Sequence, residues 1–162
     1  MNGKIVGGFI VVTALVLGAT IYWLQEYAYY AAVTFKPGDE IELTPLSGPP
    51  EPIVVKDLQG IDATSSPLRF RACFRTPLDL ATLTEAYKVY DGAVPLNGPN
   101  WFTCFDAARI GAALEKGEAV AFLSQAEIAP QIDRVVAVFP DGRAFAWHQV
   151  KAGIDVNTGA EE

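Results

Sequence analysis

Residues that bind metals or carry redox chemistry are scarce in this 162-residue chain. It contains two cysteines, one histidine and a single methionine, which is the first residue. So few soft ligands argue against a copper, zinc or iron–sulfur site. The chain also has no C-x-x-C or C-x-x-C-H motif, no glycine-rich phosphate loop and no G-x-S-x-G elbow. We therefore expect no cofactor, no metal and no catalytic residues.

The single histidine, His148, is the one candidate for general base chemistry. It lies in a strand-like run in which Ala144, Ala146 and Val150 share its face. A histidine on such a face is more often a hydrogen-bonded core residue than a catalyst. A hydrolase that uses His148 or a pair of the plentiful carboxylates stays open as a minor alternative.

Basic residues are outnumbered, with 12 Lys and Arg against 19 Asp and Glu. Eighteen of the acids and eleven of the bases follow residue 34, so that region carries the whole net charge of −7. A surface this acidic repels phosphate backbones and anionic lipid headgroups. We expect no nucleic-acid partner.

Charge is absent from twenty consecutive residues near the start, Ile5 to Leu24. As a helix they match the roughly 30 Å hydrocarbon core of a bilayer. Eleven of them are Ile, Val, Leu or Phe, which together favour insertion by on the order of 5 kcal/mol. We predict a transmembrane helix over residues 5–24 with an aromatic juxtamembrane extension to residue 33, helical as far as Ala32.

A cleaved signal peptide is the alternative to a permanent anchor. Its apolar stretch is about 7 to 15 residues long and ends at a small-x-small site. Here the stretch is longer, and the bulky Tyr22 and Trp23 directly follow the nearest small residues. We expect the span to remain in the mature protein, in contact with the lipid bilayer.

The basic residues around the span indicate its orientation. Lys4 precedes it, and the first basic residue after it is Lys36. The positive-inside rule then makes residues 1–4 a cytoplasmic stub and residues 34–150 an exported, periplasmic domain, followed by a flexible tail over 151–162.

Two cysteines in an oxidising compartment favour a disulfide between Cys73 and Cys104. The alternative is a reactive Cys73, because Arg69, Arg71 and Arg75 lie on its face of the strand-like run "LRFRACFRT" and would lower its thiol pKa. The arginines themselves either pair with acids of neighbouring elements or form a docking patch for an acidic partner.

The rest of the domain predicts a mixed, α+β fold. Helices are expected from the Thr76 cap to Tyr87 and over Asp106–Lys116, where Gly117 ends the second one. The clearest signal is a C-terminal β-hairpin, residues 133–139 and 143–150 around Pro140-Asp141-Gly142. Further strands are expected over 40–46, 52–58, 66–74 and 118–123, with a stiff proline-rich connector over 47–52 and a helical turn over 124–127.

Small residues follow one face of the predicted transmembrane helix. Gly7, Val11, Ala14 and Gly18 share this face and would let another helix approach closely, although small residues are common in any span. The aromatic side chains that follow predict an anchor in the lipid headgroup region: Tyr22, Trp23, Tyr27 and Tyr30.

Several segments resemble an uncharacterised family of small single-pass bacterial membrane proteins. They are "YWLQEYAYY", "SSPLRFRACF", "WFTCFDA", "IGAALEKGEAVAFL" and "DRVVAVFPDGRAFAWHQ", and the likeness covers nearly the whole chain except its tail. The resemblance implies a bacterial inner-membrane protein with a periplasmic domain and no known active site. Some such sequences carry a histidine-kinase label, but nothing here resembles an ATP-binding domain.

Together these features favour an accessory or assembly subunit of an inner-membrane complex, of which an energy-transducing, respiratory complex is one candidate. Its partners would be other integral membrane subunits. A periplasmic binding or sensing module is the second hypothesis, and it would need a pocket beside the three arginines.

Overall fold

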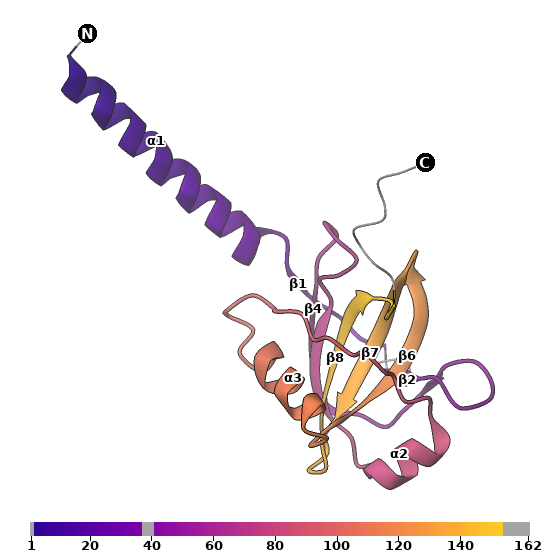
Figure 1. The fold of residues 1–162 in the computed structure, drawn as a ribbon. Helices are drawn as coiled ribbons and strands as arrows, with labels where there is room; N and C mark the ends of the chain where they lie inside the picture. The colour runs from indigo at the N-terminus through magenta and orange to yellow at the C-terminus, as the bar shows by residue number, and fades with distance from the viewer. Residues whose placement is uncertain (1, 37–40, 154–162) are drawn as a thin grey trace.

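A long helix leads into the domain. The computed structural model describes residues 2–36 and 41–153. Helix α1 (Gly3–Trp23) projects away from the domain and continues as a π-helical turn over Leu24–Ala28 (Figure 1). It is long and apolar enough to cross a membrane, as the sequence predicts. Every side chain of α1 is at least partly exposed in the described chain.

The helix ends earlier than predicted. The π-helical turn ends at Ala28, with Tyr29 as its C-cap. Ala31–Ala32 form strand β1 rather than a final helical turn. Strand β1 pairs with β4 (Lys56–Asp62), and the backbone N–H of Val33 donates to the Gly60 carbonyl at 2.9 Å. Pairing with β4 gives the backbone N–H and C=O groups of this segment their hydrogen-bond partners, which a further helical turn would otherwise have to provide.

A six-stranded antiparallel sheet forms the centre of the domain, in the order β1-β4-β5-β8-β7-β6. A small second sheet pairs β2 with β3. This mixed architecture, which ends in the β7–β8 hairpin, confirms the predicted α+β class. The remaining bounds are Glu42–Leu43 (β2), Glu51–Pro52 (β3), Arg71–Arg75 (β5), Leu80–Ala86 (α2), Ala107–Glu115 (α3), Val120–Ala129 (β6), Ile132–Val138 (β7) and Arg143–Val150 (β8).

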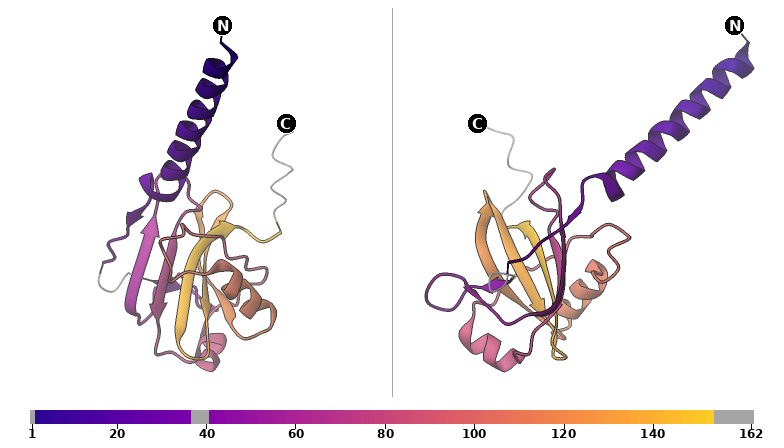
Figure 2. Two further views of the ribbon diagram at one scale, coloured as in Figure 1. Left: turned by 90° about the vertical axis from the view of Figure 1, so that its left-hand side faces the viewer. Right: turned by 180° about the vertical axis from the view of Figure 1, so that it is seen from behind.

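Both faces of the sheet are covered, because hydrophobic residues point to both sides of its central strands. Figure 2 shows α3 against one face, and α2 with β2 against the other. On the α3 side, Ile110 packs near Cys73 and Trp147. On the α2 side, Leu83 packs in one cluster with Phe74. Alternate residues of β5 thus serve two separate cores, as the alternation in the sequence indicates.

The two short helices differ in how well the sequence marks them. Helix α3 agrees with its predicted bounds, and the Asp106 side chain caps it by accepting from the Arg109 N–H at 3.0 Å. Helix α2 begins three residues later than predicted, because Asp79 and not Thr76 is the cap. Thr76 instead donates its backbone N–H to the Gly142 carbonyl at 2.9 Å.

Several strand predictions are wrong in position. The expected strand over 52–58 is replaced by β4, and the expected connector over 47–52 contributes β3 to the small sheet. The expected helical turn over 124–127 is strand, because β6 continues to Ala129 through two irregularities in its pairing with β7. Residue 40, which begins another expected strand, and residues 154–162 of the expected tail lie outside the described residues.

Candidate functional site at the junction of helix and domain

Helix and domain meet at Glu26, in the π-helical turn. Its carboxylate Oε2 accepts a hydrogen bond from the backbone N–H of Asn100 at 2.9 Å. Its backbone carbonyl accepts one from the indole Nε1 of Trp101 at 2.5 Å. Asn100 and Trp101 belong to the loop before α3, which lies far along the chain from Glu26. Two consecutive residues of this loop therefore fix the end of the helix to the domain.

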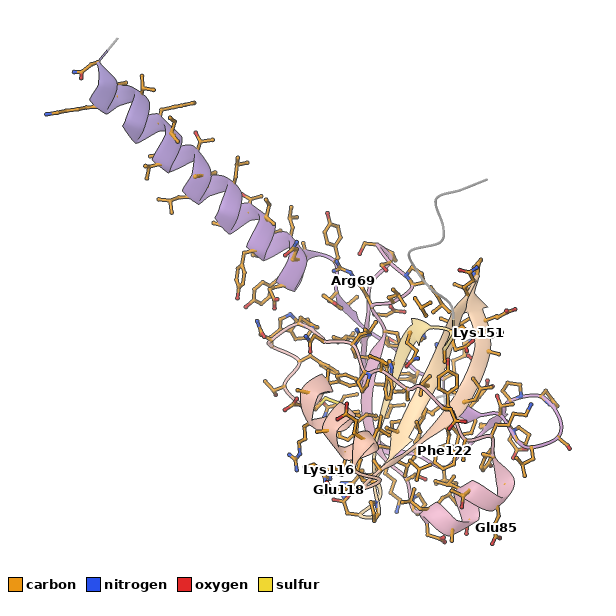
Figure 3. The ribbon with its side chains drawn as sticks, in the orientation of Figure 1. Arg69, Glu85, Lys116, Glu118, Phe122 and Lys151 are labelled. Atoms are coloured by element: carbon orange, nitrogen blue, oxygen red, sulfur yellow. A yellow bond between two sulfur atoms is a disulfide. The ribbon has the colours of Figure 1, made fainter. Side chains whose placement is uncertain are left out.

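Aromatic rings and one arginine surround this contact. Tyr30 meets Trp101 edge-on, with 6.2 Å between ring centroids. The guanidinium of Arg69 lies 5.3 Å from the Tyr30 ring and 6.0 Å from the Tyr29 ring, and Figure 3 shows Arg69 beside the end of α1. Each such cation–π contact contributes about 0.5 to 1 kcal/mol at an exposed site. We call Glu26, Tyr29, Tyr30, Arg69 and Trp101 the junction cluster.

The predicted interfacial anchors lie at this end of the helix. Tyr22, Trp23 and Tyr27 are exposed, and Tyr22 and Tyr27 meet edge-on at 6.5 Å. Tyr30 is half-buried, because its ring contacts Trp101 of the domain. Three of the four residues therefore remain exposed, and the fourth joins helix to domain. Their role as an anchor in the lipid headgroup region stays a prediction.

The small-residue face of α1 is open. Gly7, Val11, Ala14 and Gly18 are all exposed, and a side-chain carbon added at Gly7 or Gly18 would meet nothing within 4 Å in the described chain. No described residue of the domain covers this face. Its association with another helix stays a prediction.

The three arginines do not form one docking patch. Arg69 lies in the junction cluster, Arg71 is buried, with 3% of its surface exposed, and Arg75 is exposed beside Arg143 near the tip of the β7–β8 hairpin. Arg69 and Arg75 are roughly 20 Å apart along an extended chain. The predicted patch is therefore wrong, although the alternation that placed Arg71 on the face of Cys73 is correct.

Arg71 binds backbone carbonyls rather than acids. Its guanidinium donates to Phe70 and Leu68 of its own segment at 2.6 and 2.8 Å. It also donates to Leu96 and Asn97 of the loop before α3 at 2.6 and 3.0 Å. Burial lowers the pKa of Arg71 to about 10, so the group stays charged at neutral pH. The predicted pairing with acids is wrong here, and the actual role is to clamp the loop that carries Trp101 onto the sheet.

The two cysteines form the predicted disulfide. Their sulfur atoms are 2.12 Å apart, and the bond joins Cys73 of β5 to Cys104, just before α3. The alternative of a reactive Cys73 thiol is therefore wrong. Together with Arg71, the disulfide holds both halves of the loop before α3 against the same strand.

His148 is a buried, hydrogen-bonded core residue, as expected, with 4% of its surface exposed. Its Nε2 accepts from Nε of Arg134 at 2.9 Å, so Nδ1 carries the proton and donates to the Pro67 carbonyl at 2.7 Å. The ring stacks on Phe70 at 4.6 Å. Burial, followed by the charge of Arg134, lowers the pKa of His148 to about 4. Both nitrogens of the neutral ring are thus engaged, which leaves no ring atom free to accept a substrate proton.

A second set of buried polar residues was not predicted from the sequence. Gln149 accepts from the Val94 N–H at 2.8 Å and from the Trp147 indole at 3.0 Å, and donates to the Gly92 carbonyl at 3.1 Å. Asp133 accepts from the Tyr90 hydroxyl at 3.0 Å. Gln149 lies two residues after Trp147 in β8, so the two side chains share a strand face. This alternation could have predicted that Gln149 points toward the core.

Among the hollows outside the junction, two are the most spacious in the described chain. One, of about 600 Å³, is bordered by polar side chains that include Ser66, Gln125, Arg134 and His148. The other, of about 630 Å³, separates the loop 89–95 from the small residues of α3. Within residues 2–36 and 41–153, no three His, Cys, Asp or Glu side chains gather closely enough to hold a metal ion.

A comparison with protein families matches residues 41–160 to a family of unknown function, DUF6446. The chain belongs to this family. The DUF6446 match begins just before β2 and includes the disulfide, Arg71, His148 and the loop that carries Trp101, but not α1. This confirms the predicted membership of an uncharacterised family. Comparisons with curated proteins and with solved structures find no match.

Proposed function

We propose that this DUF6446 chain is a non-enzymatic accessory or assembly subunit of a bacterial inner-membrane complex. The observation that carries the proposal is a contrast along the N-terminal helix: most of α1 contacts nothing in the described chain, whereas the turn that follows it is bonded to the domain. Helix α1 is apolar and exposed on all sides, so it needs lipid or another membrane helix around it. The π-helical turn that follows α1 is fixed to the domain by Glu26. Such a unit holds a folded domain at a set position beside its partners.

The proposed topology has residues 1–4 in the cytoplasm and the domain in the periplasm. The disulfide between Cys73 and Cys104 supports an oxidising compartment for the domain. An energy-transducing, respiratory complex is the class we propose for the partner, by analogy with assemblies that recruit single-span subunits. The partner helix would pack on the face of Gly7, Val11, Ala14 and Gly18, where backbones can approach closely.

Affinity isolation from native membranes in mild detergent, followed by mass spectrometry, tests this proposal. The wild-type chain should retain larger integral membrane proteins. The double variant Gly7→Leu/Gly18→Leu should lose them, because the added side chains keep the partner helix away. Gly8→Leu/Ala19→Leu is the control, since it adds nearly the same bulk on another side of α1, where Gly8 also has open space, and it should retain the partners. A monodisperse monomer that retains nothing, or equal capture by both double variants, would contradict the proposal.

The alternative is a membrane-anchored binding or sensing module. The arginine site predicted for it is not formed, but hydroxyl, amide and guanidinium groups converge on the hollow beside Arg134 and His148. This hollow is where a ligand would bind if the alternative holds. Arg134→Gln should then abolish a ligand-induced rise in melting temperature, whereas Arg75→Gln, at the far end of β5, should not.

A further inference from the structure

One end of the domain faces the base of α1. Figure 1 and the right-hand view of Figure 2 both show the loop before α3 and the β4–β5 connection at this end. Trp101 comes from the former and contacts Glu26 of the π-helical turn, and Arg69 comes from the latter and contacts Tyr29 and Tyr30 directly after it. If α1 spans a bilayer, this end of the domain lies next to the bilayer surface.

Charge is distributed unevenly between this end and the rest of the domain. The β4–β5 connection (63–70) and the loop before α3 (92–105) contain no acidic residue, and Arg69 is their single charged residue. At the frequency of the whole chain, 19 acids in 162 residues, these 22 residues would hold about two or three. The two connections that face α1 therefore carry no carboxylate. Asp62, which pairs with Ala31 at the end of β4, lies beside them and accepts a hydrogen bond from the Ala63 N–H at 2.8 Å. The nearby Glu26 carboxylate is engaged by Asn100.

Trp101 has the properties of a residue at a lipid–water boundary. Its indole N–H is satisfied by the Glu26 carbonyl, and 40% of its surface stays exposed. Exposed tryptophan is favoured at the headgroup level of bilayers, where an apolar ring with a polar edge can sit. Arg71 and the disulfide hold the loop of Trp101 from within, so its position relative to α1 is set by the fold.

We propose that this end of the domain rests on the bilayer that holds α1, with Trp101 in the headgroup region and Arg69 bound to lipid phosphate. Arginine suits this role, since its planar guanidinium binds phosphate oxygens through parallel hydrogen bonds. The inference rests on the membrane location of α1 in the proposed function, and does not require a partner complex. The domain then has one fixed orientation, in which the hairpin tip and Arg75 face away from the membrane.

Fluorescence quenching of the full chain in phosphatidylcholine vesicles tests the position of Trp101. The full chain carries three tryptophans, and Trp23→Phe leaves Trp101 together with Trp147, which is fully buried. Phosphatidylcholine brominated near the headgroup should quench Trp101 more strongly than lipid brominated near the chain ends. In Trp23→Phe/Trp101→Phe, brominated lipid should no longer quench the fluorescence. The remaining emission of buried Trp147 also reports that the domain is folded. Equal quenching of the two variants would overturn the proposal.

A second comparison tests the phosphate contact. Arg69→Gln should weaken the quenching of Trp101, whereas Arg75→Gln, an equal change at the other end of β5, should leave it unchanged. Equal effects of the two substitutions would overturn the assignment to Arg69. The vesicles contain no other protein, so failure here is distinct from a failure to capture partners from native membranes.

Discussion

At the scale of single residues, buried polar side chains hold the loops of this domain in place. Arg71 and Gln149 both reach from the sheet to backbone groups of the segment before α3. The alternation around Cys73 could predict which face Arg71 occupies. It could not predict burial, because the cover comes from a loop more than twenty residues away in the sequence, whose backbone carbonyls leave no pattern in the amino-acid types.

Replacing Arg71 with methionine should destabilise the domain strongly. Four carbonyls lose their donor, and the loop before α3 loses its clamp, which should lower the free energy of unfolding by about 3 kcal/mol. Arg75→Met is the matched control on the same strand and should change it by less than about 0.5 kcal/mol. Chemical denaturation in detergent measures both values. Similar losses for the two variants would contradict the role of Arg71.

The stability of the domain should depend on pH through His148. Its pKa is about 4 in the folded protein and near 6.5 when unfolded, so the unfolded chain binds more protons between these values. Stability should therefore fall as the pH drops from 6.5 to 4, by roughly 3 kcal/mol from this group.

Denaturation midpoints between pH 4 and 7 check this dependence. His148→Gln keeps a polar group near Arg134 but does not titrate. The difference in pH dependence between this variant and the wild type therefore gives the contribution of His148 alone, without that of the carboxylates. Parallel pH curves for the two proteins would show that His148 is not the buried neutral group described above.

At the scale of elements, local signals predicted the ends of α3 and the hairpin turn, but they misplaced the cap of α2 and gave a helical turn over 124–127, which is strand. Long-range strand pairing was not predictable. Asp106 and Gly117 mark the ends of α3 through their own backbone chemistry, and Asp141-Gly142 marks the hairpin turn. Strands β1 and β4 lack such a signal. The residues of β4, "KDLQGID", do not alternate in hydrophobicity, and their strand conformation depends on pairing with β1 and β5.

Two glycine-to-alanine substitutions should have opposite effects. Gly142 has φ +80°, and an added carbon would lie 2.7 Å from the Thr76 carbonyl oxygen, so Gly142→Ala should destabilise the hairpin by about 1 to 3 kcal/mol. Gly111 lies within α3 with room for a methyl group, so Gly111→Ala should stabilise by about 0.5 to 1 kcal/mol. Thermal unfolding of both variants measures the difference. Destabilisation of equal size at both sites would contradict the turn geometry.

At the scale of the whole molecule, the junction cluster joins a membrane-length helix to the folded domain. The long apolar helix was readable from the sequence alone. The attachment through Glu26 and Trp101 was not, because it joins residues 75 positions apart. The proposed role depends on this coupling, since a flexible linker would not fix the domain relative to a partner or to the bilayer.

The central claim is that α1 permanently holds a disulfide-bonded domain outside the cytoplasm. Intact-mass spectrometry of the chain from fractionated cells tests it most directly. We predict a membrane-bound species that retains α1 and has lost the two hydrogens removed when Cys73 and Cys104 join. A soluble species without α1, or a chain with two free thiols, would contradict the account.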